Sequence, residues 1–105
     1  IVFAAGNGGR ADDANNDPYC RHPFTLAVGA VGRDGRRAWY SEPGACIALV
    51  APSGNAVDGI LTTDVAGAGG YAPGDATADF SGTSAATPVV AGVAAMLLQA
   101  RPALG

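Results

Sequence analysis

The sequence has no lysine, a single histidine and few charges of either sign. Its six basic residues are all arginines, and nine acids bring the net charge to -3 at pH 7. Nucleic-acid-binding domains gather basic residues on one face, so this balance predicts no nucleic-acid partner. No apolar run approaches the length that spans a bilayer, which predicts no membrane partner. The class left to examine is a globular domain.

Cysteine is also scarce, since the chain contains only Cys20 and Cys46. Two cysteines at this spacing do not form a metal-binding motif. They are compatible with one disulfide in an exported protein, or with two small buried hydrophobic side chains. The sequence leaves both alternatives open.

Hydrophobic residues make up 49% of the chain, 16 positions are glycine, and only 14% are charged. This composition is typical of a buried α/β core. A chain of 105 residues is long enough for one domain with a modest core, and no repeat or linker divides it. It opens at Ile1 without an initiator Met and stops at Gly105 just after an expected helix, so we interpret it as a fragment.

Short apolar runs predict the strands of a parallel sheet. Residues 1–5, 25–31 and 47–51 read as strands buried on both faces, and residues 60–63 as a candidate fourth. The first run ends in Gly-Asn-Gly-Gly, which indicates a tight loop at a strand end, where functional loops often lie. The polar residues 10–22 that follow predict a surface loop.

A single helix is expected near the end of the chain. Residues 67–79, rich in Gly, Ala and Pro, read as a loop. Residues 85–100 are apolar on all sides, which predicts a helix buried in the centre of a domain. Pro88 is acceptable only near its first turn, and Arg101 with Pro102 marks its end.

Ser84 stands at the start of this helix, after the turn formed by Ser-Gly-Thr. At a helix N-terminus the backbone amides and the dipole favour negative charge, which suits a nucleophilic serine. A serine in this place can also simply cap the helix, as most serines before an apolar run do. Taken alone, Ser84 favours the capping role.

The surrounding residues change that interpretation. Residues 82–88 read GTSAATP, residues 89–98 read VVAGVAAMLL, residues 3–9 read FAAGNGG and residues 26–31 read LAVGAV. In this order they resemble the nucleophile signature, central helix, oxyanion loop and following strand of the subtilisin family of serine peptidases. The resemblance implies a three-layer α/β fold with a parallel sheet and a buried central helix. Residues 1–105 would form the C-terminal portion of such a catalytic domain.

The resemblance also implies a serine endopeptidase acting on polypeptides, with Ser84 as nucleophile and Asn7 as oxyanion donor. In this family the triad runs Asp, His, Ser, so its Asp and His are expected upstream, in a half of the domain that this chain would need as a partner. His22 follows Asn7 and lacks the context of a catalytic His, so we do not assign it to the triad. Alone, the chain is expected to be inactive. The substrate-contacting residues that the resemblance implies are Ala4, Ala5, Gly6 and Thr83.

Within the family, GNGG, the Asp/Asn cluster and Trp-Tyr-Ser-Glu at residues 39–42 resemble the kexin and furin branch. This implies a structural Ca²⁺ ion held by Asp12 and Glu42, an acidic residue, Asp17, in the specificity pocket, and a secreted or extracellular protein. The loop is one residue shorter than the branch pattern, so Asp13 is an alternative to Asp12 as ligand. The first cysteine of the branch's loop is replaced by Ala14, which leaves Cys20 as a substitute opposite Cys46.

Other interpretations remain beside these. The acidic loop can be a solvated turn whose Asp and Asn side chains cap their own backbone. It is not an EF-hand, because Pro18 stands where Gly is required and Phe24 where the bidentate Glu is. A dinucleotide-binding loop is disfavoured, since no helix pattern follows residues 6–9. A catalytically dead domain that keeps the subtilisin fold for a binding or structural role is the main alternative function.

Overall fold

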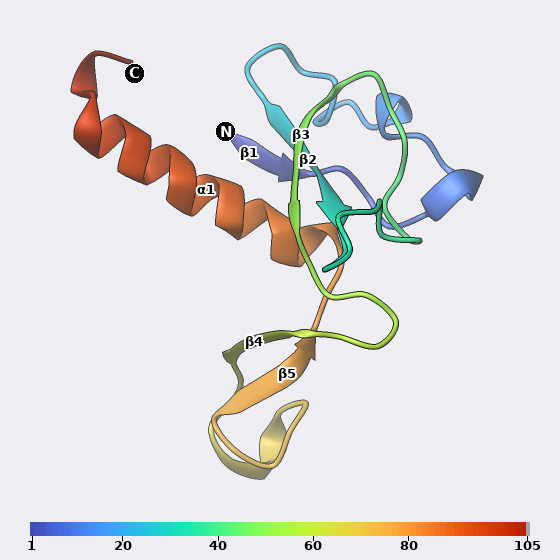
Figure 1. Cartoon of the computed structure of the whole chain (residues 1–105), viewed down its shortest axis with the longest axis vertical. Helices are drawn as coiled ribbons and strands as arrows, with labels where there is room; N and C mark the ends of the chain where they lie inside the picture. Colours follow the sequence, from blue (N-terminus) through green and yellow to red (C-terminus); the bar gives the residue numbers. More distant parts are fainter. Residues whose placement is uncertain (105) are drawn as a thin grey trace.

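The computed structural model describes residues 1–104, and its centre is a parallel sheet of three strands in the order β1-β2-β3. The strands pair in parallel, with Phe3 opposite Ala27 and Ala30 opposite Ala51. The α/β class expected from the sequence is confirmed (Figure 1). The strands are β1 (Val2–Ala4), β2 (Leu26–Val31) and β3 (Ile47–Pro52).

The three strands lie where the apolar runs predict them, but they are not equally buried. Residues 27–30 of β2 are buried because a strand pairs with β2 on each side. In β3, by contrast, Leu49 and Val50 are exposed. The expectation that β3 is buried on both faces is wrong for the described residues, since Leu49 and Val50 point to opposite faces of the sheet and neither is covered.

The helix α1 (Thr83–Ala100) begins two residues earlier than the apolar pattern predicts, so it includes Ser84. Its N-cap is Gly82, whose φ of 87° and ψ of 170° suit a residue without a side chain. Pro88 consequently lies in the second turn and not in the first. Because proline has no N–H, the Ser84 carbonyl receives no helical hydrogen bond.

Only the first turns of α1 are buried, so the prediction of a wholly buried helix is wrong for the described residues. Val90 is 7% exposed, whereas Met96 is 62% and Leu97 57% exposed. The reason is geometric: the short strands underlie the start of α1, and the helix runs on past them (Figure 1). With 18 residues and a mean hydropathy of 1.4, α1 also has the length and composition of a membrane span, contrary to our reading of the apolar runs. Core helices of soluble proteins share those properties.

Two apolar clusters occupy the two faces of the sheet, because successive side chains of a strand point to opposite faces. One joins Val28 and Ala30 of β2 to Ala86 and Val90 of α1. The other packs Ala5, Ala27, Ala14 and Cys20 together. Of the three expected layers, the described residues therefore supply α1, the sheet, and on the second face the polar loop with its short 3-10 turns η1 (Gly9–Ala11) and η2 (Ala14–Asn16).

An antiparallel pair, β4 (Ile60–Thr63) and β5 (Ala76–Phe80), extends away from the parallel sheet (Figure 1). A strand is present at residues 60–63 as expected, but it is β4 of this antiparallel pair and not a fourth strand of the parallel sheet. The loop expected over residues 67–79 is wrong at its end, because β5 begins at Ala76; the alternation Ala-Thr-Ala-Asp-Phe there is short and follows a Gly- and Pro-rich stretch. A short 3-10 turn, η3 (Gly67–Gly69), lies between β4 and β5, and another, η4 (Pro102–Leu104), follows α1.

We expect the isolated chain to self-associate through the exposed face of α1, because Val93, Met96 and Leu97 are all between 46% and 62% exposed. Replacing Met96 and Leu97 together by Gln should shift the chain toward the monomer in sedimentation analysis. The matched control is Val57→Gln with Leu61→Gln. It removes two exposed apolar side chains, one on β4 and one just before it, and should leave association unchanged. A chain that is monomeric without these substitutions would contradict the prediction.

Candidate active site

The nucleophile candidate Ser84 lies in the first turn of α1, at the carboxyl edge of the parallel sheet, and is exposed. In open α/β folds this edge is where ligands bind. The N-cap position of α1 is occupied by Gly82, which has no side chain to cap the helix. Ser84 therefore does not cap the helix, and the capping interpretation is wrong.

Asn7 comes directly after the left-handed Gly6 that ends the β1 segment, and its side chain reaches the start of α1. Its Oδ1 accepts hydrogen bonds from the Thr83 backbone N–H (2.8 Å) and from the Thr83 hydroxyl (3.0 Å). The amide oxygen is thereby occupied, while both hydrogens of Nδ2 stay available to a ligand. A Cβ placed on Gly82 would lie 3.2 Å from Nδ2, so Nδ2 borders the turn that leads to Ser84.

Thr83 joins the start of α1 to the loop after β1, although its hydrogen-bond partners Asn7 and Gly6 lie 76 and 77 positions away in the sequence. It is fully buried. Its Oγ1 accepts a hydrogen bond from the Gly6 N–H (3.2 Å), and its carbonyl accepts one from the Thr87 hydroxyl (2.7 Å). The sequence-based role of Thr83 was substrate contact; the structure gives it hydrogen bonds that hold Asn7 and Gly6.

The first three N–H groups of α1 have different fates. The Thr83 N–H donates to Asn7, and the Ala85 N–H donates to the Gly82 carbonyl at 3.0 Å. The Ser84 N–H has no acceptor within residues 1–104. It points from a helix N-terminus, where the dipole favours an anion. The Ser84 N–H and the Asn7 Nδ2 are thus two free donors beside one hydroxyl.

An acidic cavity of about 230 Å³ lies beside the oxyanion loop. Among the predicted residues, Ala5, Gly6, Asp12, Asp17 and Glu42 line it together, and Ala4 does not. Asp13 and Asn16 complete its wall.

Glu42 is the buried acid of this cavity and supports the loop from below. It is 9% exposed, and its Oε1 accepts a hydrogen bond from the Gly8 N–H at 2.8 Å. Its own N–H donates to the Gly6 carbonyl. A Cβ on Gly6 would lie 2.3 Å from Oε1, and Gly6 has a φ of 108°, so no other residue fits there without rearrangement.

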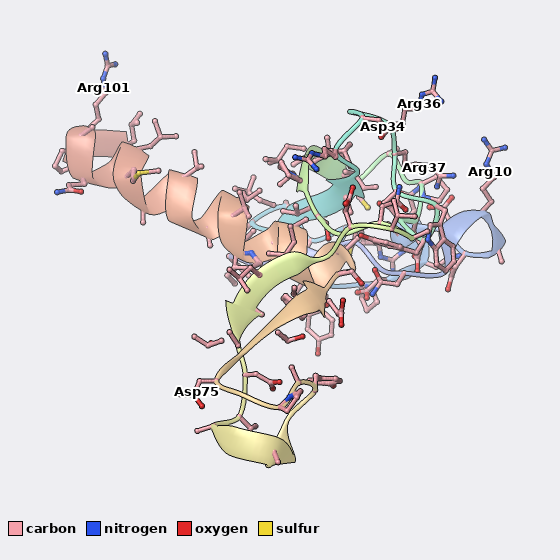
Figure 2. All side chains as sticks on the ribbon, turned by 60° about the horizontal axis from the view of Figure 1, so that its bottom comes forward. Arg10, Asp34, Arg36, Arg37, Asp75 and Arg101 are labelled. Atoms are coloured by element: carbon pink, nitrogen blue, oxygen red, sulfur yellow. The ribbon has the colours of Figure 1, made fainter. Side chains whose placement is uncertain are left out.

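No arginine neutralises this cavity. Within residues 1–104 the one ion pair joins Arg36 to Asp34, both on the surface. Figure 2 shows Arg36 and Arg101 extended away from the ribbon. The buried Glu42 carboxylate is therefore left with a single N–H partner, an arrangement that favours a cation beside it.

The other acids of the loop are partly engaged with their own backbone, as the solvated-turn interpretation expects. Asp12 accepts from the Asp13 N–H and Asp13 from the Asn15 N–H, each at 2.8 Å. Asp17 accepts from the Tyr19 and Cys20 N–H groups. Within residues 1–104 no three His, Cys, Asp or Glu side chains converge on one metal position. A metal here would rely on a pair of acids and on backbone or water oxygens.

His22 lies in the turn before β2, at the amino edge of the sheet, whereas Ser84 lies at the carboxyl edge. Its Nδ1 accepts a hydrogen bond from the Phe24 N–H at 3.3 Å. Asp64 accepts from the Ala72 and Val65 N–H groups, bonds that lower the pKa of its carboxyl. Within residues 1–104 neither His22 nor Asp64 forms a hydrogen bond with Ser84.

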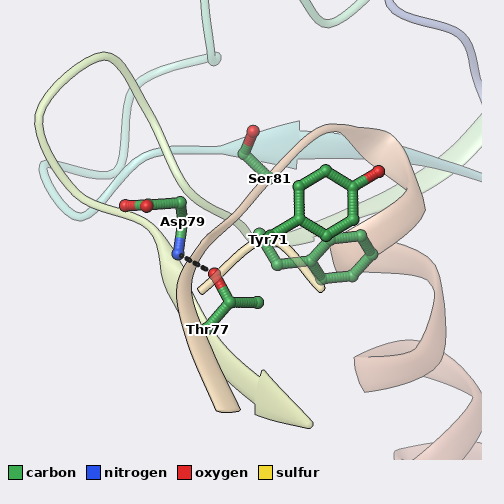
Figure 3. Close-up of a pocket in the computed structure, with 5 residues that line it drawn as sticks. Tyr71, Thr77, Asp79 and Ser81 are labelled. Atoms are coloured by element: carbon green, nitrogen blue, oxygen red, sulfur yellow. Dashed lines mark hydrogen bonds between the residues drawn. The ribbon is translucent and has the colours of Figure 1, made fainter. Parts of the chain in front are cut away.

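A second cavity, of about 220 Å³, was not expected from the sequence; Figure 3 shows the residues that line it, two of which come directly before Gly82. The Asp79 N–H donates to the Thr77 hydroxyl at its edge. Because residues 67–79 were expected to be a loop, no pocket was predicted there. The five lining residues are Tyr71, Thr77, Asp79, Phe80 and Ser81.

The two cysteines are free thiols in the structure, so they form no disulfide with each other. Cys20 is buried, and its thiol donates to the Ala4 carbonyl at 3.4 Å. Cys46 is half-buried against the same cluster. Burial, and then the negative charge of Asp17, raises the pKa of Cys20 from 9.0 to about 11.

We expect Cys46 to be alkylated much faster than Cys20 in the folded chain, because the thiolate is the reactive form. Equal alkylation rates for the two thiols would contradict the assignment.

The raised pKa of Cys20 also has a consequence for stability. Folding favours the neutral thiol, so its contribution is fully present below pH 9 and is lost as the pH rises toward 11. Urea unfolding across this range should show a falling unfolding free energy, and Cys20→Ala should flatten that fall. An equally steep fall in Cys20→Ala would contradict this role of the Cys20 thiol.

Comparison with known proteins agrees with this geometry. A family model described as the subtilase family, Peptidase_S8, matches residues 1–105. The proprotein convertase subtilisin/kexin type 7 of Mus musculus is 40% identical over 110 residues, covering 99% of this chain and 14% of the mouse protein. The calcium-dependent protease of Trichormus variabilis is 38% identical over 117 residues, covering 99% of this chain and 17% of that protein.

Among solved structures, the Aeromonas sobria serine protease in complex with its chaperone matches with a TM-score of 0.87 and 27% sequence identity. The match covers 96% of this chain and 24% of that protease, so the chain spans a minor part of the relatives it resembles. Since the family model covers the whole chain, the chain belongs to the subtilase family of peptidases.

Proposed function

We propose that the protein containing this chain is a serine endopeptidase, with Ser84 as its nucleophile. The observation that carries the proposal is the orientation of Asn7. Its side-chain oxygen is engaged by Thr83, which leaves Nδ2 and the Ser84 N–H as two unspent donors beside the Ser84 hydroxyl. Two such donors are what the developing oxyanion of acyl transfer requires.

The reaction proceeds by acyl transfer through Ser84. Its Oγ attacks the peptide carbonyl while a base takes its proton, and the carbonyl oxygen becomes an anion that Asn7 and the Ser84 N–H stabilise. Collapse of this intermediate breaks the C–N bond, and the proton passes to the leaving amine. Water then attacks the acyl-enzyme by the same route. The base is not His22, so we assign it to an upstream half of the catalytic domain.

The segment from Ala4 to Gly6 forms the side of the site along which a polypeptide would lie. Its side chains are small or absent, and the Ala5 N–H is already bonded to the Val28 carbonyl, which keeps the segment fixed. Ala5 and Gly6 also line the acidic cavity. A substrate side chain that enters this cavity meets Asp17, so we propose a preference for Arg or Lys before the scissile bond.

We further propose that a structural Ca²⁺ ion binds at Asp12 and Glu42, with Asp13 as the alternative to Asp12. The support is the buried Glu42 carboxylate without a basic partner, together with the position of Asp12. A Cβ on Gly8 would lie 2.6 Å from the Asp12 Cβ and 3.0 Å from the Glu42 Oε1, so both acids flank this glycine. Hard cations prefer such oxygen ligands. The ion would offset the repulsion between these acids.

Two parts of the proposal rest on the family resemblance rather than on a contact in this chain. One is that the protein is secreted or acts outside the cell. The other is that the upstream half supplies the Asp and His of the triad. Both bear on the active enzyme and leave the assignment of Ser84 and Asn7 unchanged.

The first test uses the full-length protein and a peptide substrate. Ser84→Ala should abolish hydrolysis, and Asn7→Ala should lower kcat by about 10²- to 10³-fold, the loss known for the oxyanion asparagine of subtilisin itself. Asn15→Ala is the matched control, because the Asn15 amide oxygen also accepts a backbone N–H, that of Cys46, but away from Ser84. The chain of residues 1–105 alone should hydrolyse nothing. Peptidase activity that survives Ser84→Ala would refute the proposal.

Specificity is tested by profiling the full-length protein on a peptide library. We expect cleavage after Arg or Lys, and Asp17→Asn should weaken that preference chiefly through KM, since a rigidly placed carboxylate is lost. Asp75→Asn, on the hairpin between β4 and β5, should change nothing. A preference for large apolar residues that Asp17→Asn leaves intact would contradict the role of Asp17.

A further inference from the structure

The Gly82–Thr83 peptide group, one residue before the Thr83–Ser84 peptide, is held at both ends. Its N–H donates to the Asn7 Oδ1 at 2.8 Å, and its carbonyl accepts a hydrogen bond from the Ser53 hydroxyl at 2.7 Å. A peptide group is planar, so two bonds on opposite edges fix its orientation. That orientation sets where α1 begins and where the Asn7 amide points.

Gly82 makes this fixation necessary. Its φ of 87° and the absence of a side chain give the backbone more freedom there than at any neighbouring residue of α1. The Gly82 carbonyl also accepts the Ala85 N–H at 3.0 Å, but that bond forms within the turn itself. The hydrogen bond from the Ser53 hydroxyl, by contrast, ties the Gly82 carbonyl to a different part of the chain, the end of β3.

Ser53 is itself rigidly placed. It follows β3 at the carboxyl edge of the sheet, is 5% exposed, and donates its N–H to the Val31 carbonyl at the end of β2 (2.9 Å). Its Oγ lies 3.0 Å from the Tyr40 hydroxyl, which also bonds to the Gly54 carbonyl. Tyr40 is buried in the cluster between sheet and helix. The Gly54 carbonyl can only accept, so it takes the single Tyr40 hydroxyl proton. The Gly82 carbonyl can likewise only accept, so the Ser53 proton is directed to Gly82 at 2.7 Å, while the Tyr40 oxygen packs against Oγ.

We propose that Ser53, oriented by Tyr40, is a positioning residue of the active site. It touches neither substrate nor Ser84, and acts through the Gly82–Thr83 peptide on the Asn7 amide. The inference rests on the proposed peptidase function for its kinetic part. Removing the Ser53 hydroxyl frees the peptide to rotate, so the donors are less often in place when the oxyanion forms.

The kinetic test compares variants of the full-length protein. Ser53→Ala should lower kcat roughly 3- to 10-fold, the range expected for one buried hydrogen bond, with KM nearly unchanged. Tyr40→Phe should lower kcat less, and Ser53→Thr should restore most of it. Ser41→Ala is the matched control: Ser41 is 1% exposed and its Oγ accepts the Ala30 N–H, but it does not contact the turn. It should lower the melting temperature and leave kcat intact.

A second readout does not need activity. Hydrogen exchange in the peptide that covers residues 81–88 should quicken in Ser53→Ala and remain unchanged in Ser41→Ala. Faster exchange with unchanged kcat would overturn the catalytic part of the inference, and unchanged exchange would overturn the positioning itself. If the unsubstituted protein neither cleaves peptides nor reacts with a fluorophosphonate, the proposed function fails, and the exchange comparison still decides whether Ser53 holds the turn. Tyr40→Phe gives the same comparison if Ser53→Ala does not fold.

Discussion

The contact between Asn7 and Thr83 is the interaction on which the rest of the site depends. It joins the loop after β1 to the start of α1 across 76 residues of sequence. Because Asn7 spends its oxygen on two Thr83 donors, the side chain can present only its NH₂ group to a ligand. The same contact gives the Thr83 N–H an acceptor, whereas the next amide, that of Ser84, has none within residues 1–104. One pair of hydrogen bonds thereby orients the Asn7 amide beside the turn that leads to Ser84.

The glycines around this contact follow from the space it allows. Gly6 has the Glu42 carboxylate directly beneath it, and Gly82 has the Asn7 amide beside it. Both have positive φ, so a side chain at either position would be strained as well as obstructed. Glu42 in turn is buried by the loop that it supports through the Gly8 N–H. The acidic cavity and Asn7 therefore share the loop after β1, and a change in the charge of the cavity acts on the backbone that carries Asn7.

Much of this arrangement could be predicted from the sequence, and the exceptions have physical causes. Short apolar runs located β1, β2 and β3, because strands buried in a parallel sheet leave little room for polar residues. The motifs around Asn7 and Ser84 located the site. The strand β5 was missed, since its alternation is short, with two small alanines among its three apolar residues, and it follows a Gly- and Pro-rich stretch; it gains its structure from pairing with β4. Ser53 was missed because a serine after a strand carries no signal until the fold places it against Gly82.

The burial of α1 marks the boundary between what local sequence decides and what tertiary contacts decide. The apolar composition of α1 correctly predicted a helix, since neither its propensity nor its hydrogen bonds depend on neighbours. It did not predict how much of the helix the described residues cover, which depends on the length and number of strands beneath it. Val90 lies over β2 and is buried, whereas Met96, less than two turns further on, is mostly exposed. The end of α1 that carries Ser84 is thus the part that the sheet holds, whereas the far end of the same helix has no partner among the described residues.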